Sequence, residues 1–445
     1  MRKRLQKRGV DLCYSQSSVH FPEGSFMYFS RRIILLTLVF VGLVACHNES
    51  LVDPVSGLPA SADEERFQSF EKNSVIMILV DGLRADVLVL NQDESPVAPN
   101  ITRLANEGLH FTKARSASSL HVQSVATIFS GRLPTMGGTT GLFEAEPHDG
   151  EPNLARAFES AGYYTGIVSN QGAIGSYGFT RNFHDIQLAT PEGPRSAIEL
   201  VQQAQQFVDD AGSDPYFLYL HFGLALPDTS GAVAYQRAIT EIDTAIGHMV
   251  AKLEADTSEF SPLIIVTAPN GYELSEHGDI GNGWTLNEEV LRVPLIFYAP
   301  EKIPPEKIDD DIGLLQLAPT LSTMLNLKEA FPDAQSLFKR NDEYLIFSPP
   351  TDLLIAELII PERVIMRSVT DGDWKYTVAT RYTTPENRKV LSKAHAATAQ
   401  SYRNGTDQPP PLWGHAAYRA AFDLSRDPTE QHNRIHEAPE SVDHL

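Results

Sequence analysis

Short apolar runs alternate with helical patterns over most of the chain from residue 74 onward. Each run is apolar on both faces, which is typical of strands buried between two layers of helices. The spacing predicts strands at 74–80, 164–169, 216–222, 262–268 and 293–299, and helices at 100–111, 124–131, 153–162, 197–212 and 232–255. This alternation predicts an α/β domain with a largely parallel central sheet flanked by helices.

The pattern changes after about residue 340, where strands of alternating polarity replace the fully apolar runs. Two of them flank the turn Asp371-Gly372-Asp373, and Asp-Gly between alternating runs is a hairpin signal. A further strand is expected within 420–428. We therefore expect the α/β domain over residues 73–340 and a small α+β subdomain over 341–445.

The first 45 residues have the pattern of a secretion signal, and those ahead of Met27 look like an over-extended start. Two arginines precede the apolar stretch 33–45, which is too short to span a bilayer comfortably. The stretch ends in Leu-Val-Ala-Cys, which resembles a bacterial lipobox. Cys46 is then the expected lipidation site and the first residue of the mature chain.

The residues that follow Cys46 indicate where the protein is located. Residues 46–72 are polar, as in a tether between a lipid anchor and a folded domain. His47 is not the aspartate that retains lipoproteins in the inner membrane. We expect a protein of the bacterial cell envelope, anchored through lipid to the outer membrane and facing the periplasm.

The formal net charge of −21 excludes two classes of partner. So acidic a chain is not expected to bind nucleic acid or to dock on an acidic membrane through a basic surface. The expected partners are the membrane, through the lipid anchor, and a sulfated or phosphorylated ester or glycan, while a protein partner stays open. Cys13 lies upstream of the cleavage point, so no disulfide is expected within one mature chain.

Few acids and histidines lie at the expected carboxyl ends of the strands, where open α/β sheets bind their ligands. Asp81 ends the first strand, His221 ends another, and Asn270, Glu276 and His277 follow a third. An unpaired buried carboxylate is costly, so Asp81 requires a cation or hydrogen-bond donors. A ligand-binding role and a turn-capping role both remain open for Asp81.

Several stretches of the chain together resemble the sulfatase family of the alkaline-phosphatase superfamily. They are NSVIMILVDGLRADVL (73–88), FSGRLPT (129–135), FLYLHFGLALPD (217–228), VTAPNGYELSEHG (266–278) and LNEEVLRVPLIFYAP (286–300). The resemblance implies an alkaline-phosphatase-like fold and hydrolysis of sulfate esters, or of phosphate esters as in relatives. It also implies a divalent metal, usually calcium, and a nucleophile that is formylglycine or a plain Ser or Thr.

The start of the family's motif is partly kept in this sequence. Asp81 matches the first metal ligand of the family, while the next position, often a second Asp, is Gly82. Arg84 is also present and is a candidate for substrate binding. The resemblance therefore assigns Asp81 to a metal site that lacks one of its usual acids.

The nucleophile position departs further from the family's pattern. The family's nucleophile opens a Cys/Ser-x-Pro-x-Arg motif ahead of a Gly-Arg step, here at Gly131, and counting back reaches His121. Gln123 and Val125 occupy the proline and arginine positions. No Cys or Ser stands where formylglycine would be made, and Ser124 lies nearby on an expected helix that points it elsewhere.

The later functional positions are also replaced. Pro269 and Asn270 stand where the family usually has Asp followed by His or Asn, so only Asn270 could offer a metal ligand. Leu226 takes the place of an active-site histidine, and Gly283 and Trp284 take that of a Lys or His. A calcium ion held by one carboxylate and one amide would bind weakly, so no cofactor beyond a weak divalent metal is expected.

The first of three hypotheses is a non-catalytic protein of sulfatase fold with a binding or assembly role in the envelope. The second is an active sulfate- or phosphate-ester hydrolase with a rebuilt site. His121 would then be the nucleophile, and Asp81, Asn270 and His277 would hold a metal. Ser124, His221 and His277 are further candidates for catalysis.

The third hypothesis is a metal-free carbohydrate-binding surface in the former cleft, where Trp284 would stack on a sugar ring. The competing interpretation of Trp284 is an ordinary core or loop aromatic residue.

Overall fold

The structure is a computed structural model that describes residues 66–89, 96–137, 139, 150–171, 174–175, 178–189, 195–224, 226, 231–255, 261–277, 280–341, 344–350, 353–360, 364–381 and 418–438. The expected signal peptide, Cys46 and most of the expected tether lie outside these residues. Within them, no helix is both long enough and apolar enough to cross a membrane. Residues 63–445 form one compact unit.

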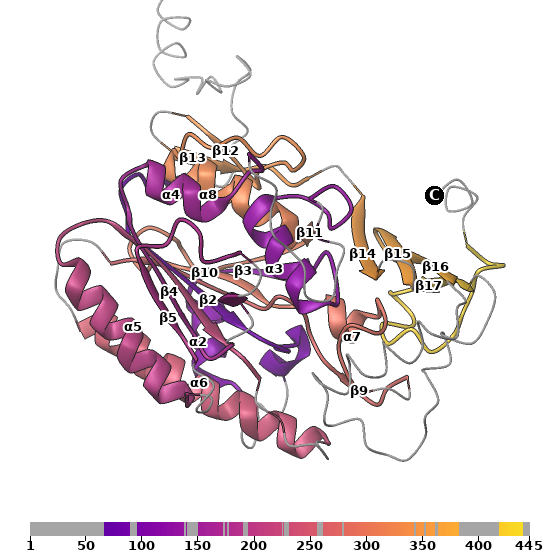
Figure 1. The fold of residues 1–445 in the computed structure, drawn as a ribbon. Coiled ribbons are helices and arrows are strands. Elements are labelled where there is room, and N and C mark those ends of the chain that lie inside the picture. Colours follow the sequence, from indigo (N-terminus) through magenta and orange to yellow (C-terminus); the bar gives the residue numbers. More distant parts are fainter. Residues whose placement is uncertain are drawn as a thin grey trace, which may run out of the picture. The chain divides into compact units, whose positions relative to one another are not determined.

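A mixed eight-stranded sheet is the main element of this unit (Figure 1). Every neighbouring pair of strands is parallel except the two pairs that β10 makes with β3 and β7. The expected α/β class with a largely parallel sheet is therefore confirmed. The strands, in spatial order, are β11 (Glu306–Gly313), β3 (Leu109–Arg115), β10 (Leu295–Tyr298), β7 (Leu263–Thr267), β2 (Val75–Val80), β6 (Tyr216–Phe222), β4 (Tyr164–Ser169) and β5 (Asp185–Leu188).

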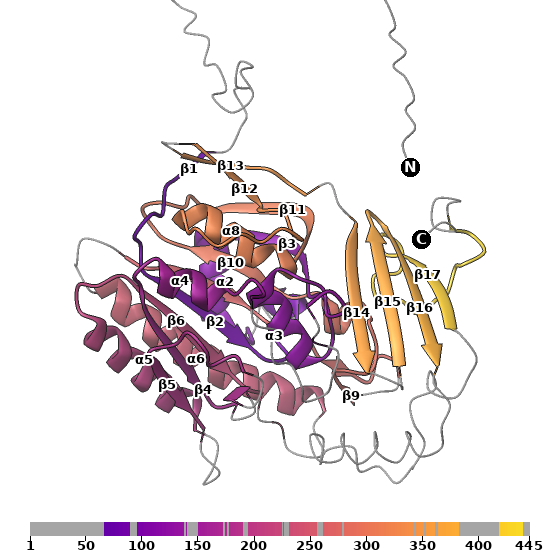
Figure 2. The same ribbon diagram turned by 45° about the horizontal axis from the view of Figure 1, so that its top comes forward.

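Helices cover both faces of this sheet (Figure 2). The middle strands β2, β6 and β7 are buried along their whole length, which explains why their sequences are apolar at every position. One face carries α2 (Pro99–Glu107), α5 (Ala197–Ala211) and α6 (Ala232–Ala255), and the other carries α3 (His121–Ser130), α4 (Leu154–Ser160) and α8 (Leu317–Leu325). Short 3-10 helices follow β2 (η1, Ala85–Val89) and β11 (η3, Leu314–Gln316).

Helix α3 begins earlier than the apolar pattern indicates. Its first residue is His121, so the histidine and Ser124 both belong to the helix. Gly131 closes it in the left-handed conformation, with φ of 65°, and donates its N–H to the carbonyl of Thr127. The start of α3 matters for function because it places His121 at the carboxyl edge of the sheet.

A small antiparallel sheet crosses the expected domain boundary at residues 340 and 341. It consists of β1 (Arg66–Gln68), β13 (Tyr344–Phe347) and β12 (Phe338–Arg340). Phe67 packs edge-on against Phe338 with ring centroids 5.3 Å apart. Strand β13 thus belongs with the main domain, and residues 66–68, expected in the tether, form a strand.

The C-terminal region forms an antiparallel sheet of four strands in chain order. They are β14 (Leu354–Ile360), β15 (Val364–Asp371), β16 (Trp374–Arg381) and β17 (Tyr418–Asp423). The expected hairpin is present, with Asp371 opposite Trp374 and Gly372 in the left-handed region at φ of 56°. The remaining elements, β8 (Glu273–Leu274), β9 (Ile280–Gly281) and α7 (Glu288–Leu291), lie between β7 and β10 in the chain.

Candidate functional site

Three elements bring an acid and two histidines together at the carboxyl edge of the main sheet. Strands β2 and β6 are parallel neighbours, and their register pairs Leu79 with His221. Asp81 follows the last residue of β2, and His121 opens α3. The ligand atoms of these three side chains all lie within 4.8 Å of one another.

One carboxylate oxygen is the centre of this cluster. Oδ1 of Asp81 lies 2.7 Å from Nε2 of His221 and 3.0 Å from Nδ1 of His121. The two imidazole rings lie nearly parallel, at 17°, with centroids 5.0 Å apart. Both ring nitrogens of His121 are buried, and neither makes a well-directed hydrogen bond to a described residue, so the contact of Nδ1 with Asp81 is an ion-pair distance.

Two residues that the sequence analysis missed hold this cluster in place. Gln171, which follows β4, donates from Nε2 to Oδ2 of Asp81 over 2.7 Å. The hydroxyl of Tyr219 is 2.9 Å from Nδ1 of His221. The sequence contains a signal for each of these residues. Gln171 follows a strand, as Asp81 does. Tyr219 precedes His221 by two residues, so the two side chains lie on the same face of their strand.

The electrostatics of the cluster favour an ionised acid. Burial opposes ionisation of Asp81, but the charge and hydrogen bonds of His121 and His221 hold its pKa well below the usual range. Burial lowers the pKa of His221, although Asp81 opposes this shift. Asp81 is thus a carboxylate, the form that binds a metal ion.

Asn270 lies beyond β7, on the other side of β2 from His221. It is only 1% exposed, and its amide nitrogen donates to the carbonyl of Gly271 over 2.9 Å. Its Oδ1 is buried without a hydrogen-bond partner among the described residues. A buried amide oxygen without a donor has capacity for a cation, because unpaired buried polar atoms are costly.

The lost second acid at position 82 has a structural explanation. Gly82 has φ of +69°, and a Cβ atom there would lie 2.7 Å from Cδ2 of Leu224. Tyr272 lines the same space at 3.5 Å. An aspartate at this position would need both a left-handed backbone and room that Leu224 and Tyr272 occupy.

Ser124 is not positioned as an attacking group. It is buried, and its hydroxyl is 2.7 Å from the carbonyl oxygen of Ser118 and 3.1 Å from the hydroxyl of Ser116. These contacts fold the serine-rich loop onto the start of α3. The structure does not bring Ser124 into the cluster of Asp81.

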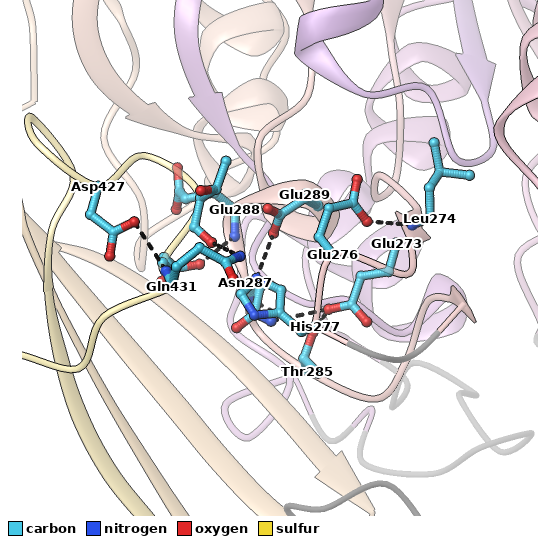
Figure 3. A network of polar contacts seen from close by, with 12 residues as sticks. Glu273, Leu274, Glu276, His277, Thr285, Asn287, Glu288, Glu289, Asp427 and Gln431 are labelled. Carbon is cyan, nitrogen blue, oxygen red and sulfur yellow. Dashed lines mark hydrogen bonds and ion pairs between the residues drawn. The ribbon is translucent and has the colours of Figure 1, made fainter.

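His277 belongs to a different polar network, shown in Figure 3. Its Nε2 lies 3.5 Å from Oε2 of Glu289, and this contact raises the pKa of His277. In the same network, Oε1 of Glu273 accepts from Thr285 at 2.6 Å and from Asn287 at 3.1 Å. Among the described residues, His277 is not part of the group that could share a metal with Asp81.

The two candidate substrate-binding residues, Arg84 and Trp284, are respectively bonded to other protein groups and buried. The guanidinium of Arg84 bonds to Asp86, Glu276 and the carbonyl of Tyr272. Trp284 is 8% exposed, so its ring offers little surface on which a sugar could stack. Their positions favour structural roles for both side chains.

A buried ionic network joins the main sheet to the C-terminal region. Nζ of Lys375 lies 3.1 Å from Glu288 and 3.0 Å from Glu430, and Arg115 also contacts Glu288. Burial, with the nearby charge of Glu288, raises the pKa of Glu430 to about 7, although Lys375 opposes this shift. No sequence pattern pointed to this network, because its members lie far apart in the chain.

The donors around Asp81 do not fit the calcium ion that the resemblance implies. Calcium takes about six to eight oxygen ligands from carboxylates, carbonyls and water. Here Asp81 supplies the only carboxylate of the cluster, and its two nearest partners are imidazole nitrogens. The residues can hold a metal, but their chemistry is that of a nitrogen-rich site.

The fold and the site define an α/β protein whose polar cluster lies beyond the carboxyl ends of its middle strands. The family described as Sulfatase matches residues 73–223 and 228–327. The chain therefore belongs to the sulfatase family.

Individual relatives agree with this assignment. Arylsulfatase A of Bos taurus is 25% identical over 449 residues, which cover 84% of each chain. Among solved structures, a 2-O GAG sulfatase has a TM-score of 0.60 at 16% identity, covering 82% of this chain and 88% of its own. A protein in complex with its substrate D-glucosamine-2-N,6-O-disulfate has a TM-score of 0.60 at 14% identity, covering 84% and 96%.

Proposed function

We propose that this chain is a binding protein of sulfatase fold, in which the ester-cleaving centre has been replaced and which does not cleave esters by the family's covalent route. One observation carries the proposal: the residue at the nucleophile position is an imidazole turned onto Asp81. Its Nδ1 lies 3.0 Å from the carboxylate, and both ring nitrogens are buried. An attacking atom must be able to reach the substrate in line with the leaving group.

The charges around the site support the same proposal. Cleavage of a sulfate ester builds negative charge on oxygen, which cationic groups must stabilise. Arg84 is committed to Asp86 and Glu276, and Val125 stands at the family's arginine position. Of the described side chains, Ser124 is the nearest hydroxyl to His121 along α3, and it is buried against Ser118.

The ligand we propose is a sulfated glycan, bound rather than cleaved. A protein of the same fold is known in complex with a disulfated glucosamine, which supports this class of ligand. The location we propose is the periplasmic face of the outer membrane, with the lipid on Cys46. It rests on the lipobox-like sequence at residues 43–46.

The test has two arms. In the first, the purified full-length protein is incubated with a panel of chromogenic sulfate and phosphate esters. We expect no turnover above that of the His121→Ala variant. In the second, calorimetry with sulfated oligosaccharides and their unsulfated counterparts should show binding of the sulfated forms only. Turnover that His121→Ala abolishes would overturn the proposal.

One observation favours a second candidate, an active ester hydrolase with a rebuilt site. Asp81, His121 and His221 converge as the ligands of such a site would. A metal held there would supply positive charge for an oxyanion, and Asp81 and the imidazoles would hold it. The ester panel separates the two candidates, because only the hydrolase shows turnover that requires His121.

A further inference from the structure

The cluster of Asp81, His121 and His221 has the dimensions of a site for a four-coordinate metal ion. Zinc bound to nitrogen and oxygen at about 2.0–2.1 Å in a tetrahedron separates its ligand atoms by about 3.3 Å. The corresponding atoms here are separated by 2.7 and 3.0 Å around the carboxylate oxygen. An ion would need to widen these two gaps by about 0.6 and 0.3 Å, and the ligand atoms of all three residues already lie within 4.8 Å of one another.

The arrangement of the two imidazole rings gives an independent measure. Two imidazoles bound to one tetrahedral ion at this bond length place their ring centroids about 5 Å apart. The centroids of His121 and His221 are 5.0 Å apart. The rings therefore have the separation of two ligands on a common ion.

The neighbours of the cluster orient it as partners of metal ligands do. A ligating histidine usually bonds through its other ring nitrogen to a second group, which fixes its tautomer. Nδ1 of His221 meets the buried hydroxyl of Tyr219 at 2.9 Å, which leaves Nε2 to face Asp81. Gln171 holds the second oxygen of Asp81 in the same way.

The identity of the donors selects the metal. Two imidazoles and one carboxylate suit zinc and the neighbouring first-row divalent ions, whereas calcium and magnesium prefer sites made of oxygen. Three protein ligands also leave a tetrahedral ion one open position. The unpartnered Oδ1 of Asn270 is a further donor at the same edge of the sheet.

We propose that Asp81, His121 and His221 bind one zinc ion, or another divalent first-row transition-metal ion, in place of the calcium of the family. The site supplies the positive charge that the lost lysine and arginine no longer provide, and its open position accepts an anionic group. This inference deepens the proposed function by naming how an anionic ligand is held. It is tested by metal binding, whereas the proposed function is tested by ester turnover, so the failure of one can be told from the failure of the other.

The experiment titrates zinc and calcium into the metal-free full-length protein by calorimetry. We expect one zinc ion per chain and no calcium binding at the same concentrations. His121→Ala should weaken zinc binding by at least about 100-fold, since even groups behind a ligand contribute about 10–100-fold. The matched control is His110→Ala, a half-buried histidine on β3 outside the cluster, which should bind zinc as the parent does.

A second readout identifies the ligands themselves. Cobalt bound in place of zinc should give the visible absorption of a four-coordinate site, which His121→Ala should abolish. Tyr219→Phe keeps all three ligands and should weaken zinc binding by about 10-fold. If His121→Ala does not fold, this second variant still tests the proposal. Calcium binding that requires His121, or zinc binding that neither variant weakens, would overturn the proposal.

Discussion

The Cδ2 atom of Leu224 lies where a side chain on Gly82 would have to start, 2.7 Å from the position of a Cβ atom. Gly82 also has φ of +69°, a conformation that other residues adopt at a cost. A side chain at position 82, such as the second acid of the family's metal site, would therefore have to shift the end of Leu224 and adopt a disfavoured backbone conformation.

We predict that Gly82→Asp destabilises the protein by roughly 2–3 kcal/mol, because backbone strain, displacement of the Leu224 side chain and a buried charge act together. The variant should bind no calcium. The matched control is Gly372→Asp, which also has a positive φ but no atom within 4 Å of the added Cβ. It should cost only about 1 kcal/mol. Equal losses in urea unfolding for the two variants would contradict the packing argument.

Asp81 accepts contacts on both of its oxygens, so its charge should stabilise the fold. In the Asp81→Asn variant, an amide NH₂ faces hydrogen-bond donors that the carboxylate oxygens of Asp81 now accept. We expect a loss of about 1–3 kcal/mol in the free energy of unfolding at pH 7, because buried polar groups are left unsatisfied. Asp86→Asn, on an exposed acid that pairs with Arg84, should cost less than about 1 kcal/mol. Urea unfolding of metal-free protein measures both. A more stable Asp81→Asn variant would show that the cluster is strained instead.

Lys375 is completely buried between Glu288 and Glu430. Lys375→Met should destabilise the protein by about 3–5 kcal/mol, because the ionised Glu288, and Glu430 wherever it is ionised, lose a buried cation. Lys252→Met is the control, since Lys252 is 49% exposed and pairs with an exposed Asp209. That change should cost less than about 1 kcal/mol. Thermal or urea unfolding that gives the two variants the same stability would contradict the expected difference.

Glu430 should make the stability depend on pH. Its pKa rises from 4.5 to about 7 on folding, so between these values the folded state keeps a proton that the unfolded state has lost. Stability therefore falls as pH rises through this window, by on the order of 3 kcal/mol in total, at about 1.4 kcal/mol for each pKa unit.

Glu430→Gln should remove that fall, as measured by urea unfolding between pH 4 and pH 8. The exposed Glu107→Gln variant should keep the pH profile of the parent. A profile that Glu430→Gln leaves unchanged would mean that the proton is held elsewhere.

The class of the fold could be predicted because its strands are buried on both faces and its helices are amphipathic. The direction of β10 could not be predicted, since its residues 295–298 are as buried as those of β7, its antiparallel neighbour, which itself runs parallel to β2. Burial sets which residues are apolar, whereas strand direction depends on how the chain returns to the sheet. The position of β13 was missed for a similar reason, because its partner β1 comes from the other end of the described chain.

The site was predictable in part. Asp81 and His221 follow from the ends of adjacent strands, and counting along the family's motif reaches His121. Their contact depends on where α3 begins, and the apolar pattern placed that start too late because His121 itself is polar. The roles of Gln171 and Tyr219 depend on which strands are neighbours, which the sequence pattern alone does not specify.

The amide of Gln123, at the family's proline position, bonds to both the N–H and the carbonyl of Ile359. Ile359 lies in β14, the edge strand of the C-terminal sheet, and the N–H of Glu357 in the same strand donates to Ala117. A proline side chain could make neither bond. Together with Ala117, the glutamine thus satisfies backbone groups along this edge of the sheet, which leaves fewer of them free to pair with a strand of a second molecule.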